Sequence, residues 1–598
     1  MNDESANQTS YADPQVFADI AQRSQRLVND FMARHASEMH EKSVDPANIG
    51  GAFLEMTTRL MSDPAKLMQA QMSLWQDYLS LWQTTAGRMM GQDTGPVVEP
   101  EAGDRRFRDP AWNENQVFDY MKQSYLLTSR WLEDVVGDVE GLDDKTSRKV
   151  EFYTHQLTDA LSPTNFALTN PEVLRATVDS KGENLVKGLQ NLLEDFERGD
   201  GKLRISMTDE DAFEVGVNIA VTPGKVVYRN DLMELIQYEP STDEVKSKPL
   251  MIIPPWINKF YILDLRPENS FIKWAVDQGH TVFVISWVNP DAELAAKGFE
   301  DYMLEGPLEA LQAIETATGE REVNVIGYCI GGTLLASALA YVAACDDESH
   351  QGRIASATYF TTMLDFTEAG DLGVFIDEEQ LADLERKMDQ RGYLEGKDMA
   401  GTFNVMRSSD LIWSFVINNY MLGKEPFPFD LLYWNSDNTR MPAAMHSFYL
   451  RKMYLENKLI EPGGIELAGV PIDLGTIDTP SYMVSTRDDH IAPWKSTYAA
   501  MEIFKGPMRF VLSASGHIAG IVNPPVKQKY CYWTNAKKVK APEKWLDGAE
   551  SHDGSWWPDW DKWIGKYSGK LVAARIPGKG GLKALEPAPG SYVKKDAR

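Results

Sequence analysis

The sequence predicts an α/β fold with a mostly parallel sheet and helices on both faces, preceded by a mainly helical N-terminal domain. From about residue 226 onward, short apolar runs alternate with helical segments, which is the pattern of parallel strands buried on both faces. Before about residue 200, apolar residues recur at helical spacing. A chain of 598 residues is also too long for one typical core, so we expect at least two domains.

The N-terminal helices are rich in Met, Leu and Trp between residue 14 and about residue 95. In one of them, Asp63 and Pro64 start a helix. Its apolar residues are expected to share one side of that helix, namely Leu67, Leu74, Tyr78, Leu81 and Trp82. Two interpretations stay open: this side packs against neighbouring helices, or it adheres to a hydrophobic partner surface.

A linker and a second helical stretch complete the first domain. Gly, Pro and acidic residues cluster without apolar periodicity at about 91–104, and helices resume from Trp112 to about Arg198. We therefore predict a mainly helical domain over residues 1–200 and a catalytic domain over residues 201–598.

The catalytic domain is expected to begin with an antiparallel pair, VVYRN and LMELIQY, and to continue with buried strands. The first four buried strands are predicted at 249–255, 280–288, 323–329 and 357–366. The alternation lapses at about 367–470 and resumes in PSYMVSTRDDH and MRFVLSASGH, so we predict an inserted cap subdomain of the kind that covers a site. The tail after Pro524, including SWWPDWDKW, is expected to wrap over the surface.

Composition excludes several classes of protein. A net charge of −28 argues against a nucleic-acid binder, which needs a basic face. The three cysteines, Cys329, Cys345 and Cys531, lack the paired spacing of a metal site or a disulfide framework. No apolar run is long enough to span a membrane, and the first residues do not resemble a secretory signal, so we expect a cytoplasmic protein.

The stretch NVIGYCIGGTLLA joins a predicted strand to a predicted helix through Gly-Tyr-Cys-Ile-Gly. A strand, a turn of the form Gly-x-nucleophile-x-Gly and a helix make a nucleophile elbow, in which a strained residue exposes its side chain. Gly327 and Gly331 supply the small flanks, and the positive end of the following helix favours the thiolate of Cys329. The alternative is a buried structural cysteine at a glycine-rich strand end.

An elbow nucleophile needs an acid and a base, which follow in that order along the chain. Asp488, Asp489 and His490 follow the strand YMVST, and His517 follows the strand FVLSA. We predict His517 as the base because it comes after the last strand of the sheet, and we take His490 as a neighbour of the site. The alternative for His517 is a hydrogen-bonded loop histidine without a catalytic role.

The oxyanion site is expected to combine two backbone amides, the first of which belongs to Ile330, directly after the nucleophile. The second belongs to the loop after the PLMIIPP strand, where Trp256, Ile257 and Asn258 are the candidates. The sequence does not decide among them. We take the backbone amide of Ile257 as the expected second donor and expect Asn258 to lie beside the site.

A thiol at the elbow favours acyl transfer over hydrolysis. When cysteine attacks an acyl thioester, one thioester replaces another, so the acyl group stays activated for a second transfer. A serine would instead give a less reactive oxygen ester. The chemistry thus points to an enzyme that draws on acyl-CoA and passes the acyl group to an alcohol.

Six motifs in order carry a resemblance to a known family. They are DRRFRDPAW (104–112), PPWINKFYILDL (254–265), GYCIGG (327–332), LLYWNSD with FYLRKMYLENKL, TRDDHIAPW (486–494) and SGHIAGIVNPP (515–525). With these motifs the chain resembles the class I polyhydroxyalkanoate synthases, which have an α/β-hydrolase fold and polymerise (R)-3-hydroxyacyl-CoA into storage polyester. The resemblance covers most of the chain.

The resemblance implies roles for individual residues. Cys329 is expected to be the nucleophile, Asp489 the catalytic acid and His517 the general base, with His490 outside this triad. Trp434 matches a tryptophan that the family associates with the cap, the channel and dimerisation, although a large aromatic also suits a core. Whether His517 or Asp489 deprotonates the 3-hydroxyl stays open.

The resemblance also implies partners and a location. We expect short-chain substrates such as 3-hydroxybutyryl-CoA, no metal or other cofactor, and a homodimer. The expected location is the cytoplasm, at the surface of polyester granules and their associated proteins. The rival predictions are a dienelactone-hydrolase-like cysteine esterase or thioesterase, and a catalytically inert granule scaffold.

Overall fold

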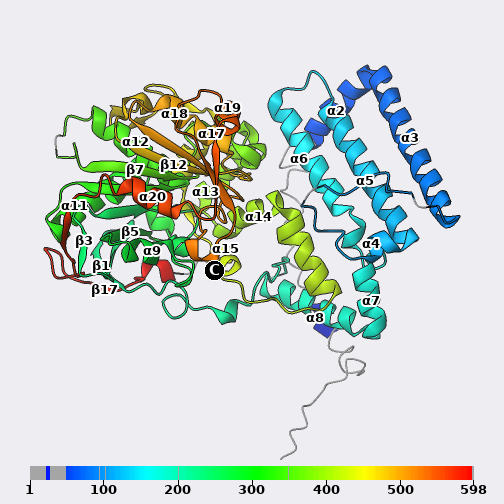
Figure 1. Ribbon diagram of the computed structural model, residues 1–598, viewed down its shortest axis with the longest axis horizontal. Coiled ribbons are helices and arrows are strands. Elements are labelled where there is room, and N and C mark those ends of the chain that lie inside the picture. The colour runs from blue at the N-terminus through cyan, green and yellow to red at the C-terminus, as the bar shows by residue number, and fades with distance from the viewer. Residues whose placement is uncertain are drawn as a thin grey trace, which may run out of the picture. The chain divides into compact units, whose positions relative to one another are not determined.

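The computed structural model describes residues 22–23, 25–26 and 49–595, except residues 93, 102, 200 and 348. Most of the helical stretch expected between residues 14 and 48 therefore lies outside the described residues. The chain divides into two compact units, Met1–Asp209 with Thr402–Phe427, and Glu210–Gly401 with Pro428–Arg598 (Figure 1). In the described part of the chain, no helix is both long and apolar enough to cross a membrane.

The first unit is helical. Its helices are α2 (Ile49–Ser62), α3 (Pro64–Met89), α4 (Ala111–Glu114), α5 (Gln116–Gly137), α6 (Asp144–Ala160), α7 (Pro171–Asp179) and α8 (Glu183–Arg198). Helix α5 packs between α3 and α6 (Figure 1). The predicted start of α3 is confirmed, because Asp63 is the N-cap, its carboxylate accepts the amide of Lys66, and Pro64 is the first helical residue.

Four of the five residues predicted to share one side of helix α3 are buried or partly buried, namely Leu67, Leu74, Tyr78 and Leu81. Leu81 is fully buried as predicted, but Trp82 is 63% exposed. Trp82 belongs to a second stripe of exposed residues at spacings of three and four, which contains Met68, Met72, Trp75, Leu79 and Trp82. One turn of helix separates the residues within each stripe, so adjacent positions such as 81 and 82 point in different directions.

The segment predicted as a linker is packed rather than free. Val98 is buried, and the amide of Val97 donates to the side-chain oxygen of Gln123 on α5 at 2.7 Å. Farther along, Arg106 donates to Asp104 and to Asp159 of α6. The lack of apolar periodicity indicated a linker, and hydrogen bonds attach this linker to the helices.

The predicted cap insert at 367–470 is not one unit. Its middle part, Thr402–Phe427, belongs to the first unit, where it packs against α8. The amide of Asn184 donates to the carbonyl of Met421, and the hydroxyl of Tyr420 donates to Asp195 at 2.5 Å. The sequence offered no signal for this division, because the partners lie more than 200 positions away.

The second unit is built on an 11-stranded sheet in the order β15-β14-β13-β12-β7-β6-β4-β5-β2-β1-β17. The central strands β13, β12, β7, β6, β4 and β5 run parallel to one another. The strands at both edges of the sheet are antiparallel to their neighbours. The strands are β1 (Gly224–Arg229), β2 (Met233–Tyr238), β4 (Leu250–Ile253), β5 (Val282–Trp287), β6 (Val323–Tyr328), β7 (Ile354–Phe360), β12 (Ser481–Thr486), β13 (Met508–Ser513), β14 (Cys531–Thr534), β15 (Glu550–Asp553) and β17 (Glu586–Pro587). The predicted mostly parallel sheet and the initial antiparallel pair are thus confirmed.

Alternate residues of the central strands enter two different hydrophobic clusters. Met251 and Val325 join one cluster, whereas their neighbours Ile252 and Ile326 join the other. Both faces are therefore covered, which explains why these strands are continuously apolar. Helices that contribute include α10 (Phe299–Met303), α11 (Glu309–Thr318), α12 (Ile330–Ala344), α17 (Trp494–Tyr498) and α18 (Ala500–Ile503) on the first cluster, and α9 (Phe271–Asp277) and α20 (Trp557–Ile564) on the second.

The tail after Pro524 does not simply wrap over the surface, so that expectation is wrong. It adds strands β14, β15 and β17 to the sheet, and the side chains of Trp556, Trp557 and Trp560 are fully buried. The indole of Trp560 donates to the hydroxyl of Thr358 on β7 at 3.0 Å. The tryptophan-rich sequence is therefore part of the core that covers one face of the sheet.

The cap residues that stay with the second unit lie between β7 and β12. They include α13 (Glu378–Arg391), α15 (Asp430–Ser436), α16 (Ala443–Phe448) and the π-helical segment Tyr449–Leu455. Short strands β8 (Tyr393–Leu394) and β9 (Met441–Pro442) pair within this region. An insertion at this point starts where a parallel strand ends, which is the edge of the sheet where such folds place their sites.

Candidate active site

Cys329 lies between the end of β6 and the start of α12, with φ 52° and ψ −123°. This backbone conformation is costly for a residue with a Cβ, and it turns the side chain out of the strand direction. The amide of Cys329 donates to the carbonyl of Phe360 on β7 at 2.8 Å, which holds the turn to the neighbouring strand. A Cβ on Gly331 would collide with the carbonyl oxygen of Ile253, so the close approach of β4 to the elbow requires glycine there.

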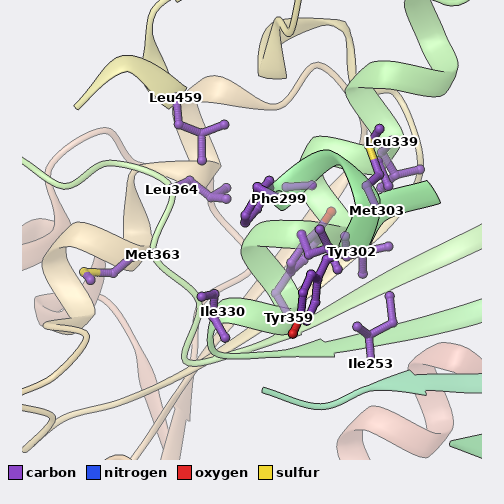
Figure 2. Close-up of a cluster of buried hydrophobic side chains, with 14 of the residues drawn as sticks. Ile253, Phe299, Tyr302, Met303, Ile330, Leu339, Tyr359, Met363, Leu364 and Leu459 are labelled. Atoms are coloured by element: carbon purple, nitrogen blue, oxygen red, sulfur yellow. The ribbon is translucent and has the colours of Figure 1, made fainter. Parts of the chain in front are cut away.

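Apolar side chains border the elbow. Figure 2 shows Ile330 at the start of α12, with Met363 and Leu364 nearby from the chain after β7 and Ile253 from β4. Leu459 of the cap lies close to Leu364 in the same view. All five residues are buried. Surroundings of this kind keep water away from a reacting group.

His517 and Asp489 form a hydrogen bond of 2.7 Å between Nδ1 and Oδ2. They follow the neighbouring parallel strands β13 and β12, whose last residues are in register, so both loops leave the same edge of the sheet. Asp489 is itself held in place, since Oδ1 accepts the amides of Ile491 and Ala492 at 2.9 Å and Oδ2 accepts the hydroxyl of Thr486. The predicted preference for Asp489 fits its burial, because Asp488 is exposed.

The electrostatics join Cys329 to this pair. Burial lowers the pKa of His517, but the negative charges of Asp489 and Cys329, with hydrogen bonds to both, raise it from 6.5 to about 10. Burial raises the pKa of Asp489, and the charge and hydrogen bond of His517 together with two backbone amides leave it below its usual value. His517 therefore favours its protonated form, between the carboxylate of Asp489 and the sulfur of Cys329.

Two cap tyrosines that were not predicted as site residues, Tyr449 and Tyr454, interact electrostatically with Cys329. Burial, the charge of Tyr454 and the charge of Cys329 raise the pKa of Tyr449. Burial and the charge of Cys329 likewise raise the pKa of Tyr454. Their ring centroids lie 5.4 Å apart, edge to face, and Phe366 packs on Tyr454 at 4.9 Å. Both tyrosines lie in the quoted motif FYLRKMYLENKL, but nothing in that stretch indicates contact with the elbow.

The structure places the two candidate oxyanion amides at the same end of the sheet as the elbow. Among the described residues, neither the amide of Ile330 nor that of Ile257 donates to a protein acceptor. The side chain of Trp256 is buried against Tyr302 and Trp287, and its indole donates to Met445. The side-chain oxygen of Asn258 is buried without a hydrogen-bond partner in the described part of the chain.

The remaining predicted residues, His490 and Trp434, differ in their burial and in their hydrogen bonds. His490 directly follows Asp489, is half-buried, and its carbonyl accepts the amide of Asp371 at 3.0 Å. Trp434 is buried on α15, and its indole donates to the carbonyl of Lys259 at 2.7 Å. Trp434 is therefore a contact of the loop that carries Ile257 and Asn258.

The first unit contains a polar cavity of about 1020 Å³. Arg106, Tyr125, His155 and Ser408 are among its lining residues, and none of the predicted site residues lines it. Within residues 49–595 as described, no group of three or more His, Cys, Asp or Glu side chains is arranged to hold a metal ion.

Comparisons with known proteins identify the family of the chain. Two family models match the sequence, the poly-beta-hydroxybutyrate polymerase (PhaC) N-terminus over residues 103–275 and the alpha/beta hydrolase fold over residues 263–524. The poly(3-hydroxyalkanoate) polymerase subunit PhaC of Rhizobium meliloti is 51% identical over 94% of this chain and 91% of its own length. The poly(3-hydroxyalkanoate) polymerase of Methylorubrum extorquens is 50% identical over 97% and 98%. The PhaC subunit of Cupriavidus necator is 44% identical over 83% of each chain.

Proposed function

The chain belongs to the family of poly(3-hydroxyalkanoate) polymerases, and on this premise we propose that it transfers (R)-3-hydroxyacyl groups from CoA thioesters, through an acyl-cysteine, to a growing polyester chain. Membership of the family makes it an enzyme of polyester synthesis with an α/β-hydrolase fold. The observation that carries the proposed mechanism is the charge coupling of Cys329, His517 and Asp489, which raises the pKa of the histidine to about 10.

Acylation of Cys329 is the first proposed step. The thiolate attacks the carbonyl carbon of the acyl-CoA, and the negative oxygen that forms is stabilised by the amides of Ile330 and Ile257. The bond between the carbonyl carbon and the CoA sulfur then breaks, and the CoA thiolate takes the proton of the His517 imidazolium. The unused donor capacity of both amides supports this role.

Transfer to a hydroxyl is the second step. The hydroxyl oxygen attacks the acyl-cysteine, its proton passes to His517, and the bond to the Cys329 sulfur breaks to restore the thiolate. We assign this proton transfer to His517, because both oxygens of Asp489 already accept hydrogen bonds and Asp489 is buried. Acylation also removes the negative charge of Cys329, which lowers the pKa of His517 and readies it to accept a proton.

The apolar border of the elbow supports polymerisation over hydrolysis. An acyl-cysteine that meets water is lost as a free acid, whereas a dry site leaves the hydroxyl as the acceptor. Ile330, Leu364 and Leu459 supply such a border. The proposed chemistry uses no metal and no cofactor other than the CoA of the substrate.

We extend the proposal to substrate and partners. The enzyme acts on short-chain substrates such as (R)-3-hydroxybutyryl-CoA, forms a homodimer, and works in the cytoplasm at the surface of polyester granules with their associated proteins. The uncharged exposed stripe of α3, with Met72, Trp75 and Trp82, supports contact with a polyester surface, because an ester polymer carries no charge.

The decisive experiment follows CoA release and turbidity together. With (R)-3-hydroxybutyryl-CoA, we expect the wild type to release CoA and to turn the solution turbid with polymer, and a longer homologue to react more slowly. Cys329→Ala should abolish both signals, while Cys531→Ala, which removes another half-buried free thiol, should retain them. CoA release into a clear solution would indicate a thioesterase, and full activity of Cys329→Ala would exclude the acyl-cysteine.

A further inference from the structure

The loop that supplies the second oxyanion amide is held by a segment of the cap. We call residues Trp256–Tyr261 the oxyanion loop and residues Trp434–Thr439 the clamp segment. Both belong to the second unit. The two segments are about 180 positions apart in the sequence, but they are joined by an isolated bridge between Asn258 and Asn438.

Two side chains of the clamp segment donate hydrogen bonds to the backbone of the oxyanion loop. The hydroxyl of Thr439 lies 2.6 Å from the carbonyl oxygen of Trp256 and 2.7 Å from that of Ile257, so its single proton is shared between them. The indole of Trp434 donates to the carbonyl of Lys259 at 2.7 Å. Three carbonyls of the loop thus accept hydrogen bonds from two side chains of the clamp segment.

A carbonyl that is held in place also orients an amide. The peptide bond is planar and trans, so the carbonyl of Trp256 and the amide of Ile257 lie in one plane and point in opposite directions. The carbonyl of Ile257 and the amide of Asn258 are related in the same way. Thr439 therefore sets the direction of two of the three candidate amides for the second oxyanion donor, those of Ile257 and Asn258, and it polarises them as well.

A buried ion pair keeps Thr439 at this position. Lys259 and Asp437 approach to 2.7 Å, with side chains that are 5% and 7% exposed. The second oxygen of Asp437 accepts the hydroxyl of the fully buried Tyr261 at 2.7 Å. Charges buried in this way require a well-defined geometry, because a displaced partner would leave an unpaired charge away from water.

We propose that Thr439 is a positioning residue of the oxyanion site, held against the oxyanion loop by Asp437 through Lys259 and Tyr261. The inference rests on the proposed function, and it adds a dependence on the cap. The oxyanion amide is aimed correctly only while the clamp segment is seated on the loop, so the position of the cap governs the acylation step.

The test separates attack on a carbonyl from the reactivity of the thiolate. Acylation by (R)-3-hydroxybutyryl-CoA forms an oxyanion, whereas alkylation of Cys329 by iodoacetamide does not. We expect Thr439→Val to slow the first turnover of CoA release by roughly tenfold to hundredfold, as for a misplaced oxyanion donor, with an unchanged alkylation rate. Thr439→Ser retains the hydroxyl and should restore most of the rate.

Matched variants control for general loss of packing. Thr497→Val removes an equally buried hydroxyl that donates to the carbonyl of Trp494, away from the loop. Tyr261→Phe is paired with Tyr482→Phe, since both tyrosines are fully buried and donate to a carboxylate, Asp437 and Asp559 respectively. Tyr261→Phe should slow CoA release more than Tyr482→Phe, at comparable melting temperatures.

Three outcomes decide the matter. Slower CoA release in Thr439→Val and Tyr261→Phe, with normal alkylation, supports the inference. Equal effects of Thr439→Val and Thr497→Val, or a parallel loss of alkylation, would overturn it. A wild type that releases no CoA would instead overturn the proposed function, so the two failures are distinguishable.

Discussion

Replacing Asp489 by Asn is expected to change the tautomer of His517 while the side chain keeps its shape. Oδ1 of Asp489 accepts two backbone amides, from Ile491 and Ala492, so the amide oxygen of an asparagine would stay at that position. Its NH₂ group would then take the place of Oδ2 and face Nδ1 of His517. The imidazole must accept that hydrogen bond, which places its own proton on Nε2 and leaves no acceptor for the thiol of Cys329.

The magnitude follows from the pKa of His517. Its rise from 6.5 to about 10 corresponds to about 5 kcal/mol at 1.36 kcal/mol per pKa unit, and Asp489 supplies the largest raising contribution. Loss of the carboxylate should lower CoA release from (R)-3-hydroxybutyryl-CoA roughly 10²-fold to 10⁴-fold, the range seen when a triad histidine adopts the wrong tautomer. The rate of alkylation of Cys329 by iodoacetamide at pH 7 should fall as well.

The assay combines stopped-flow CoA release with alkylation, for Asp489→Asn beside Asp488→Asn. Asp488 is exposed, so its substitution should leave both rates close to wild type. If Asp489→Asn kept more than a tenth of the wild-type CoA release, or if its alkylation at pH 7 were normal, the charge coupling described above would be refuted.

Three further predictions concern stability and the cap. Because the pKa of His517 is raised, its protonation stabilises the fold fully below pH 6.5, and this contribution is lost as pH rises toward about 10. The melting temperature of the wild type should therefore fall more between pH 7 and 9.5 than that of Asp489→Asn. Equal falls in melting temperature would contradict the raised pKa of His517. Tyr454→Phe should lower kcat for CoA release several-fold at an unchanged melting temperature, and unchanged kcat would exclude a role for the hydroxyl in the site. Trp560→Ala should lower the free energy of unfolding in urea by about 3–5 kcal/mol, because Trp560 is fully buried. Trp82→Ala should change the free energy of unfolding by less than about 0.5 kcal/mol but weaken adsorption to polyester particles, because Trp82 is exposed. A similar loss of stability in both variants would contradict their different burial.

The cap and the elbow are linked more closely than a simple lid requires. The clamp segment reaches the backbone of the oxyanion loop through Thr439 and Trp434. Tyr449 and Tyr454 come from the next part of the cap, and the charge of Cys329 contributes to the raised pKa of each. Cap residues therefore interact with two parts of the proposed acylation site, the nucleophile Cys329 and the loop that is proposed to bind the oxyanion.

Features that depend on neighbouring positions were predictable from the sequence. Continuous apolar runs marked the strands of the sheet, and Asp63 with Pro64 marked the start of α3. The elbow was predictable for the same reason, because its strained turn depends on Gly327, Cys329 and Gly331 in one short stretch. The tail after Pro524 was misjudged, since charged residues between its tryptophans concealed a buried helix face.

Features that depend on distant partners came only from the tertiary structure. The sequence by itself determined the fold class, the strained turn that carries Cys329, and the order in which Asp489 and His517 follow this turn, because these properties depend on the spacing of neighbouring residues. The tertiary structure decided that Thr439 lies on the oxyanion loop, that Tyr454 lies near the thiol, and that residues 402–427 pack with the first unit. Such contacts join segments separated by tens to hundreds of positions, and the free energy of packing that selects them is not encoded in any single stretch of residues.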